Sequence, residues 1–233
     1  MKKIIKKILP LRVREKIWEW YWLLLNIKLG FSYSQHAEDI LLIKSGVLSV
    51  SKKGFYIDIG AHHPKIFSNT YKLYKSGWTG INIDPIPGML KKFRERKKDI
   101  NLNIGISNNG DPIKYYSYKN TPLNTFDTDR VEELKKEGIF PCNEIEIKTQ
   151  KLCEVLKKYS PEREIDLMSI DVEGYELDVL KSNNWDKFKP KIIIIEIHNM
   201  NFNNPKDNVI HSYLDKLGYK LFARTPYNSL YKI

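Results

Sequence analysis

Acidic and imidazole side chains stand at or near the ends of four apolar stretches of this sequence. Asp58 lies in FYIDIG, Asp84 ends GINID, and Asp171 ends EIDLMSID. Glu196 and His198 end the fourth stretch, KIIIIEIH. Any one carboxylate at such a place can cap a helix, but folding does not require one at each. These groups can take up a proton or bind a cation, so together they predict a shared chemical site.

Predicted strands and helices alternate along the chain. The strands are expected at Gly54–Gly60, Gly80–Asp84, Ile100–Ser107, Glu164–Asp171, Lys191–His198 and near Tyr219–Ala223. Helices are expected at Asn69–Ser76, at Gly88–Lys98, between Asp171 and Lys181, and near Val209–Leu217. This alternation predicts an α/β fold with a mostly parallel, doubly wound sheet and helices on both faces. In such sheets ligands bind at the carboxyl ends of the strands, which is where the acids fall.

The composition is that of an ordinary globular protein with a basic surface. Of 233 residues, 42 % are hydrophobic and 29 % are charged, which suits one sizeable domain with a short extension. The formal charge of +11 favours phosphate-bearing partners, but the lysines are scattered rather than gathered in a nucleic-acid-binding stripe. Cys142 and Cys153 have neither metal-pair nor redox spacing, which indicates a reducing cytoplasm.

Residues 1–30 are predicted to form a basic, aromatic helical extension before one domain over residues 31–233. Charged residues interrupt the apolar region and no small-residue cleavage site follows, so a signal peptide is disfavoured. The apolar run that begins at Trp20 is too short to span a bilayer. Two interpretations stay open. Trp18, Trp20 and Trp22 pack the helix onto the domain or a second subunit, or the helix rests on an anionic membrane.

The loop after the first predicted strand reads GAHHPKIFSNT and lacks the glycines of a phosphate cradle. A dinucleotide site would show G-x-G-x-x-G, whereas Gly60 alone follows Asp58 here. A smaller ligand with a positive centre and a ribose fits better, and S-adenosylmethionine has both. Gly60 would let the backbone approach its methionine part, and Asp58 would lie near its ammonium group. Asp84 would then take both ribose hydroxyls.

These motifs resemble the FkbM family of S-adenosylmethionine-dependent methyltransferases. The stretches that carry the resemblance are YSQHAEDILL at Tyr33–Leu42, FYIDIGAHHP with SNT at Phe55–Thr70, GWTGINIDPIPGMLKKF at Gly77–Phe93, IDLMSIDVEGYELDVLKS at Ile165–Ser182 and IIIIEIH at Ile192–His198. His62, His63 and Pro64 depart from the family's common GAN-x-G and are similar to a subgroup that reads GAHHP followed by SNT. The resemblance implies a Rossmann-like class I methyltransferase fold and O-methyl transfer.

The resemblance also assigns the cofactor-binding positions. A polar element before the first strand is implied to close over S-adenosylmethionine, and residues after the third strand are implied to lie along the adenine edge. Polar residues that open the next helix are implied to meet the methionine carboxylate. The matched positions are Gln35, Asp58, Gly60, Ala61, Ser68, Asn69, Asp84, Gly105, Ile106 and Ser107.

Transfer to a hydroxyl is helped by a base, which contributes about 10²–10⁴-fold in rate. The candidates are His198, which ends a buried strand with Glu196 and Asp171 beside it, and the loop residues His62 and His63. A second interpretation stays open, in which Asp171, Glu196 and His198 hold Mg²⁺ or Mn²⁺ and the cation acidifies a hydroxyl of the acceptor.

The expected acceptor is a sugar hydroxyl, because many relatives modify surface polysaccharides, lipopolysaccharides or glycosylated natural products. A nucleotide-activated sugar and a lipid-linked glycan both stay open. Methylation of nucleic acid is the alternative, but the sequence after the fourth strand reads DVEGYE where base methyltransferases carry N/D/S-P-P-Y/F/W. A non-catalytic cofactor-binding scaffold is a third class. Acceptor specificity is expected in residues 108–147 and 200–207, and the protein is expected in the cytoplasm, free or at the inner face of the membrane.

Overall fold

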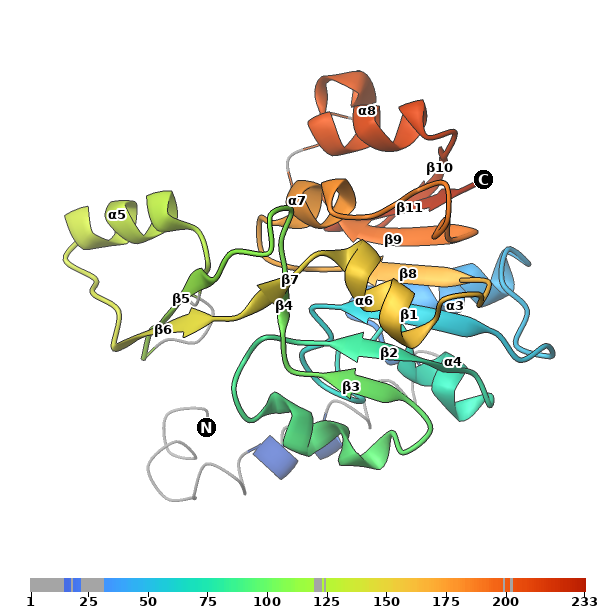
Figure 1. Ribbon diagram of the computed structural model, residues 1–233, viewed down its shortest axis with the longest axis horizontal. Helices are drawn as coiled ribbons and strands as arrows, with labels where there is room; N and C mark the ends of the chain where they lie inside the picture. The colour runs from blue at the N-terminus through green and yellow to red at the C-terminus, as the bar shows by residue number, and fades with distance from the viewer. Residues whose placement is uncertain are drawn as a thin grey trace.

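A computed structural model describes residues 15–17, 19–21, 32–119, 123, 125–198, 200–201 and 203–233. A seven-stranded sheet in the order β10-β11-β9-β8-β1-β2-β3 runs through its centre (Figure 1). All neighbours pair in parallel except β11, which runs antiparallel to both β9 and β10. The strand order reverses beside β1, so the expected doubly wound, mostly parallel sheet is confirmed.

The sheet strands are β1 (Phe55–Ile59), β2 (Thr79–Ile83), β3 (Ile100–Leu102), β8 (Leu167–Ile170), β9 (Ile192–Glu196), β10 (Lys220–Arg224) and β11 (Asn228–Lys232). The helices around it are α3 (Glu38–Lys44), α4 (Tyr71–Lys75), α6 (Leu152–Tyr159), α7 (Glu176–Lys181) and α8 (Val209–Lys216), with 3-10 turns η1 (Met89–Glu95) and η3 (Pro205–Asp207). The helix α8 begins at the side chain of Asn208, which accepts hydrogen bonds from the N–H groups of Ile210 and His211.

Both faces of the sheet are covered, which explains the apolar runs of its central strands. The helices α6, α7 and α8 pack on one face through side chains such as Leu152 and Leu214. On the other face α3 and α4 contribute Leu42 and Leu73. Ile192–Ile195 in β9 are all buried, as a strand with two covered faces requires.

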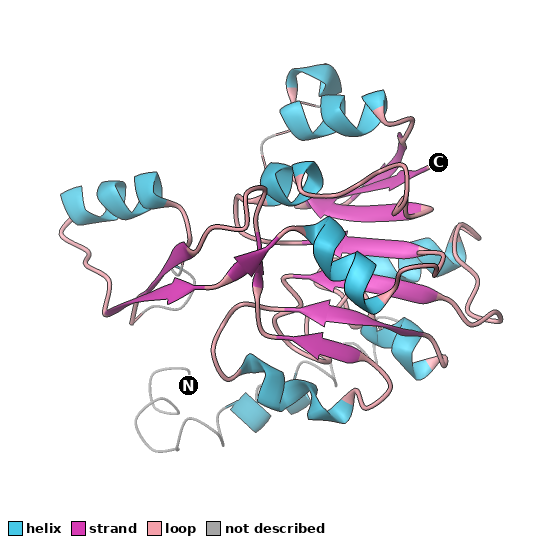
Figure 2. Cartoon of the chain, viewed as in Figure 1, coloured by secondary structure: helices cyan, strands magenta, loops and turns pink. Residues whose placement is uncertain are grey.

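A side lobe is inserted in the chain between β3 and β8 (Figure 2). It holds the antiparallel pair β5 (Ile113–Ser117) and β6 (Asn143–Ile147), with α5 (Thr128–Lys136) between them in the chain. A second pair, β4 (Gly105–Ile106) and β7 (Thr149–Gln150), joins the lobe to the sheet. The lobe therefore gives secondary structure to much of the segment that the sequence marked as least regular.

Two expectations about elements were wrong, and two elements were not predicted. The strand expected at Ile100–Ser107 breaks after Leu102, where the side-chain N–H₂ of Asn103 donates to the carbonyl oxygens of Asp84 and Ile86. The α-helix expected at Gly88–Lys98 is the 3-10 turn η1, which ends where Arg96 is drawn into the protein interior. The sequence reading also left out α6 and β11.

The N-terminal segment is described at residues 15–17 and 19–21, which are helical. Trp20 is 66 % exposed and Tyr21 is 61 % exposed, so packing of Trp20 onto the domain was wrong. Trp18 and Trp22 lie outside the described residues, as does the expected domain boundary after residue 30. Within the described part of the chain, no helix is both long enough and apolar enough to cross a membrane.

Candidate active site

The carboxyl ends of four parallel strands meet at one edge of the sheet. Ile59 of β1 pairs with Ile83 of β2 and with Ile170 of β8, and Ile170 pairs with Ile195 of β9. The residues that follow these positions are therefore brought level with one another. They are Gly60, Asp84, Asp171 and Glu196, and the sequence predicted all four for the site.

Gly60 allows the ends of β1 and β8 to come close together. Its φ is +79°, a left-handed conformation that disfavours side chains, and a Cβ at this position would lie 1.6 Å from the carbonyl oxygen of Asp171. The glycine is therefore required by the protein's own backbone, in addition to any ligand. The buried Ala61 follows it, and its N–H donates to the carbonyl oxygen of Ile83 at 3.1 Å.

Asp84 is held as a fixed carboxylate at the end of β2. Its Oδ2 accepts a hydrogen bond from the His62 N–H at 2.8 Å, and its Oδ1 accepts one from the Ile86 N–H at 2.9 Å. Burial raises the pKa of Asp84, while these two N–H groups and the charge of Lys92 act in the opposite direction. Each oxygen keeps lone pairs for further donors, so the group can still accept bonds from a pair of hydroxyls.

The two loop histidines have different surroundings. His62 is exposed and has a φ of +48°, so its backbone is strained where its N–H meets Asp84. The ring of His63 supports the loop, because its Nδ1 accepts hydrogen bonds from the N–H groups of Lys65 and Ile66, both at 3.1 Å. Burial, with nearby positive charge, lowers the pKa of His63 to about 4. A neutral ring whose Nδ1 is already occupied is a poor base, and the catalytic role of His63 stays a prediction.

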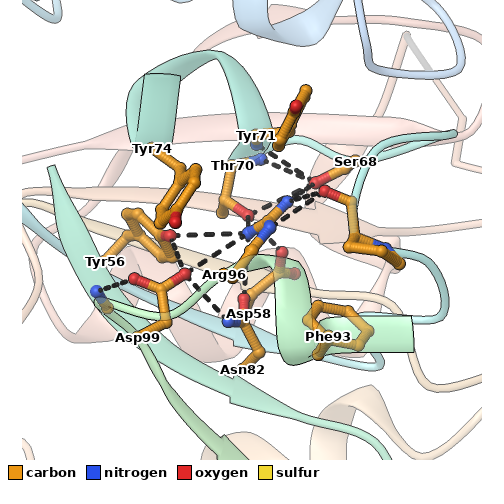
Figure 3. Close-up of polar contacts among 12 residues, drawn as sticks. Tyr56, Asp58, Ser68, Thr70, Tyr71, Tyr74, Asn82, Phe93, Arg96 and Asp99 are labelled. Carbon is orange, nitrogen blue, oxygen red and sulfur yellow. Dashed lines mark hydrogen bonds and ion pairs between the residues drawn. The ribbon is translucent and has the colours of Figure 1, made fainter. Parts of the chain in front are cut away.

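Arg96 supports the predicted cofactor loop, and the sequence did not predict this role. Its side chain is completely buried and reaches from η1 into the loop that follows β1 (Figure 3). Its Nε and Nη2 donate to the carbonyl oxygen of Pro64 at 2.9 and 2.6 Å, and Nη2 also donates to Ser68 Oγ at 2.7 Å. Its Nη1 donates to Thr70 Oγ1 at 2.8 Å and to Asn82 Oδ1 at 3.1 Å.

The Arg96 cluster also takes in carboxylates. Thr70 Oγ1 donates to Asp58 Oδ2 at 2.5 Å, and the Nη1 of Arg96 lies 3.8 Å from Asp99 Oδ2. Burial raises the pKa of Asp58, and the charge of Arg96 opposes that shift. The cluster therefore places positive charge among buried acids and links both ends of the loop from Pro64 to Thr70.

Several predicted cofactor residues make contacts inside the protein. The carboxylate of Asp58 and the hydroxyl of Ser68 belong to the Arg96 cluster, as Figure 3 shows. Asn69 donates through Nδ2 to Ser169 Oγ at 3.0 Å, which joins the loop to β8. These contacts shape the loop, and direct binding of cofactor by the three residues stays a prediction.

The remaining predicted cofactor positions lie in two separate segments, one around β4 and one before α3. Gly105 and Ile106 form β4, and Ser107 Oγ lies 2.6 Å from Thr149 Oγ1 in β7. Gln35 is exposed in the segment before α3. That segment is anchored by its neighbour Glu38, which is fully buried.

The catalytic residues are predicted at the carboxyl end of β9, and this part of the site is called the catalytic edge below. It pairs an imidazole with a carboxylate. The His198 Nε2 lies 3.3 Å from Glu196 Oε1, and the side chains are 56 % and 12 % exposed. Burial raises the pKa of Glu196 to about 7, with the charges of Glu173 and Glu176 adding to the shift. Burial and the nearby carboxylates, Glu196 first among them, raise the pKa of Asp171 well above its usual value. An exposed ring backed by a partly buried acid is the arrangement of a general base and its orienting group.

The predicted metal ligands lie near one another but do not have the arrangement of a metal site. Among the described residues, no group of three or more His, Cys, Asp or Glu side chains has the arrangement of a metal site. Asp171, Glu196 and His198 are all described, so this structure does not offer them as a ligand set for Mg²⁺ or Mn²⁺. The metal assignment stays a prediction without geometric support.

Comparison with known families agrees with this edge of acids. The family model of the methyltransferase FkbM domain matches residues 58–221, which run from Asp58 in β1 to Leu221 in β10. The chain belongs to the FkbM methyltransferase family. The family implies methyl transfer and the use of S-adenosylmethionine. The GAHHP subgroup is not distinguished by this match.

Solved structures place the FkbM chain in the class I methyltransferase fold. An FkbM methyltransferase from Methylobacillus flagellatus KT matches with a TM-score of 0.50 and 14 % identity, over 84 % of this chain and 48 % of that one. This chain thus spans about half the length of that protein. A fibrillarin/Nop5p complex (TM-score 0.42, 13 % identity, 85 % of this chain and 79 % of that one) and monomeric WbdD (0.45, 13 %, 87 % and 41 %) also match. No curated protein matches the chain by sequence.

At the carboxyl edge of the sheet, Asp84 fits the ribose of S-adenosylmethionine. Asp84 is a carboxylate whose two oxygens are fixed by backbone N–H groups at the end of β2, beside the strand-order reversal where class I ligands bind. The two hydroxyls of a ribose can each donate a hydrogen bond to such a carboxylate. When bound, the cofactor supplies an electrophilic methyl group.

Replacing Asp84 with alanine is expected to weaken cofactor binding by about tenfold or more, because hydrogen bonds to a charged acceptor are lost. Calorimetry with S-adenosylhomocysteine measures the change. The control is Asp186→Ala, which removes an exposed carboxylate outside this edge and should leave the affinity unchanged. Equal affinities for both variants and the parent would show that Asp84 does not hold the ribose.

Proposed function

We propose that this FkbM methyltransferase methylates a sugar hydroxyl, in the biosynthesis of a surface polysaccharide such as capsule or lipopolysaccharide, or of another glycoconjugate. The observation that carries the proposal is the His198–Glu196 pair, with 3.3 Å between Nε2 and Oε1 at the carboxyl edge of the sheet. A sugar hydroxyl is a weak nucleophile, so a positioned base is the group that such a reaction needs.

The pair can divide the work between its two members. The partly buried Glu196 accepts the Nε2–H of His198 and so fixes the orientation of the ring. The ring's Nδ1 is then the basic nitrogen, on the side away from Glu196. It would take the proton from the acceptor hydroxyl, while bound S-adenosylmethionine would supply the methyl group and leave as S-adenosylhomocysteine. Alignment of that oxygen is a proximity effect to which the walls of the site contribute.

The charge at this edge favours a sugar over the nucleic-acid alternative. Four carboxylates lie close to one another here: Asp171, Glu173, Glu176 and Glu196. Burial and charges within this group raise the pKa values of Asp171 and Glu196. A phosphate backbone would approach this cluster against its negative charge, whereas nucleic-acid sites are lined by Lys and Arg. A neutral pyranose with several hydroxyls meets acceptors instead.

Mass spectrometry of methyl transfer tests the proposal. The purified enzyme is incubated with S-adenosylmethionine carrying a labelled methyl group and with separate pools of nucleotide sugars, lipid-linked glycans and RNA, with and without divalent cations. Label in a sugar hydroxyl is the expected result. Label in RNA would favour the alternative function, and cofactor binding without label in any pool would favour a non-catalytic scaffold.

We also propose that the protein works in the cytoplasm, at the inner face of the membrane. The support is the exposed helical face of Ile17, Trp20 and Tyr21, which follow one another at helical spacing after a lysine-rich start. Aromatic residues beside positive charges suit an anionic lipid interface.

Flotation with vesicles should detect this contact. The chain is expected to float with vesicles that contain phosphatidylglycerol and to remain in solution with neutral phosphatidylcholine vesicles. Replacing Trp20 and Tyr21 together with serine should abolish flotation without changing thermal stability, because both rings are exposed in the monomer. If the double variant instead changes the oligomeric state and the parent never floats, the aromatic face belongs to a homodimer interface.

A further inference from the structure

Three rings from distant parts of the chain gather beside the catalytic edge. His36 precedes α3, His198 follows β9, and Tyr227 lies in the turn between β10 and β11. The Tyr227 ring centroid lies 5.1 Å from that of His36, at an interplanar angle of 67°. It lies 5.7 Å from that of His198, at 59°. Tyr227 therefore stands between an upstream histidine and the proposed base.

The backbone that carries these rings is tightly held. The buried Glu38 accepts hydrogen bonds through Oε1 from Thr225 Oγ1 at 2.7 Å and from Asn228 Nδ2 at 2.9 Å. Its Oε2 accepts the N–H of His36 at 3.0 Å. One carboxylate thus joins the segment before α3 to the turn between β10 and β11.

Tyr227 is also joined to the strand of the proposed base. The Ile197 N–H donates to the carbonyl oxygen of Tyr227 at 2.9 Å, next to His198 in the chain. This backbone hydrogen bond, just beyond the end of β9, holds the turn that carries Tyr227 beside His198. A wall of this kind is in place before a ligand arrives.

The ring of Tyr227 keeps a free face, and polar atoms around it lack hydrogen-bond partners. Tyr227 is 43 % exposed, although both histidine rings lie against it. Two buried atoms, Nδ1 of His36, whose ring packs on Tyr227, and Oε2 of Glu196, which is paired with His198, have no hydrogen-bond partner within the described structure. Buried polar atoms of this kind are normally satisfied, so both side chains have unmet hydrogen-bonding capacity.

We propose that Tyr227, flanked by His36 and His198, is the platform on which the acceptor's pyranose ring stacks. A pyranose has one face of C–H groups, which suits the electron-rich face of an aromatic ring, and hydroxyls around its rim, which suit polar neighbours. Because His198 lies beside Tyr227, a sugar seated on that ring carries its rim hydroxyls to the base. The inference deepens the proposed function and rests on it for the identity of the acceptor.

The alternative location for acceptor binding is the side lobe. Phe140 is 66 % exposed there and is another aromatic ring that a sugar could contact. It lies in the segment between α5 and β6, at the end of the lobe that is farther from the sheet (Figure 1). Phe140→Ala is therefore both a matched control for the loss of an exposed ring and a test of that location.

Ligand-observed saturation-transfer NMR tests the platform without any methyl transfer. The probes are methyl pyranosides of glucose, galactose, mannose and rhamnose, each measured with the full chain in the presence of S-adenosylhomocysteine. The parent, Tyr227→Phe and Phe140→Ala should saturate the C–H protons on one face of at least one glycoside. Tyr227→Ala should weaken the binding of that glycoside by about tenfold or more, with thermal unfolding unchanged.

Each other outcome overturns the platform. The platform is overturned if Tyr227→Ala binds the glycoside as the parent does. It is also overturned if only Phe140→Ala loses binding, or if the parent binds none of the probes. The proposed function is judged separately by methyl transfer. Transfer to sugar that Tyr227→Ala leaves untouched removes the platform but keeps the function, whereas Tyr227-dependent binding without transfer keeps the platform and removes the function.

Discussion

Replacing Arg96 with methionine is expected to lower the free energy of unfolding by about 3–5 kcal/mol, the cost of leaving a buried charge without its partner. The guanidinium is fully buried, and its removal leaves Asp99 and Asp58 in the interior without the positive charge between them. It also takes both donors away from the carbonyl oxygen of Pro64. Urea denaturation followed by circular dichroism measures the change.

The neighbouring arginine provides the control. Arg94 stands two residues earlier in η1 and is exposed, so Arg94→Met should change the free energy of unfolding by less than about 0.5 kcal/mol. Arg96→Lys should fall between the two, because lysine keeps the charge but cannot reproduce the planar fork of donors. A loss below about 1 kcal/mol for Arg96→Met would contradict the role of the cluster as a support of the cofactor loop.

The sequence predicted the strands whose surroundings demand a distinctive composition. β1, β2, β8 and β9 are covered on both faces, so their apolar runs are required by burial and can be read without knowing the fold. The acids at their ends could be placed on one edge because parallel strands bring their carboxyl ends together. Asp84, Glu196 and His198 follow directly from that topology.

Other parts depend on contacts that no local pattern records. MLKKFRERKK has the composition of an ordinary basic surface helix, and nothing in its spacing marks Arg96 as the one cation drawn inside. Its burial depends on partners from separate segments, including Pro64, Thr70 and Asn82. Tyr227 is a similar case, since its neighbours His36 and His198 meet it only after the sheet has formed.

The same limit explains the residues whose expected role lacks support. Ser68 and Asp58 were assigned to cofactor by motif, but their hydroxyl and carboxylate are used around Arg96. His63 was a candidate base by its place after Gly60, but its Nδ1 supports the loop. A motif states which residues lie near a site, whereas the direction of each side chain depends on partners elsewhere in the chain.

Replacing His198 with alanine is expected to reduce turnover by about 10²–10⁴-fold, the usual contribution of a general base, with little change in the affinity for S-adenosylhomocysteine. Glu196→Gln should reduce turnover less, because the amide can still contact the ring at Nε2 but no longer carries the charge that stabilises the protonated imidazole. Labelled-methyl transfer into the accepting sugar pool measures both rates. The control is His211→Ala, since His211 lies in α8 and contacts Tyr231 rather than the catalytic edge.

The pH dependence of the parent follows from Glu196. Its pKa is raised to about 7, first by burial and then by Glu173 and Glu176. Below that pH the carboxyl takes up a proton and no longer stabilises the positive charge on His198, so turnover should fall as the pH drops through about 7. Glu196→Gln cannot take up this proton and should lose that part of the profile, which a merely structural change at the position would not remove.

A chelator titration then separates the base from the metal-ion mechanism. If His198 acts as a base oriented by Glu196, the purified enzyme should keep full activity in excess chelator, and added Mg²⁺ or Mn²⁺ should not rescue His198→Ala. Asp171→Asn should then be milder than loss of the imidazole, because burial and the neighbouring carboxylates, Glu196 first among them, raise the pKa of Asp171 and so disfavour its charged form. If a divalent cation acidifies the acceptor, chelation should abolish activity, Mg²⁺ or Mn²⁺ should restore it, and Asp171→Asn should be as damaging as His198→Ala. We expect the first result, because the imidazole and Glu196 are in contact while no described group of side chains converges as a ligand set.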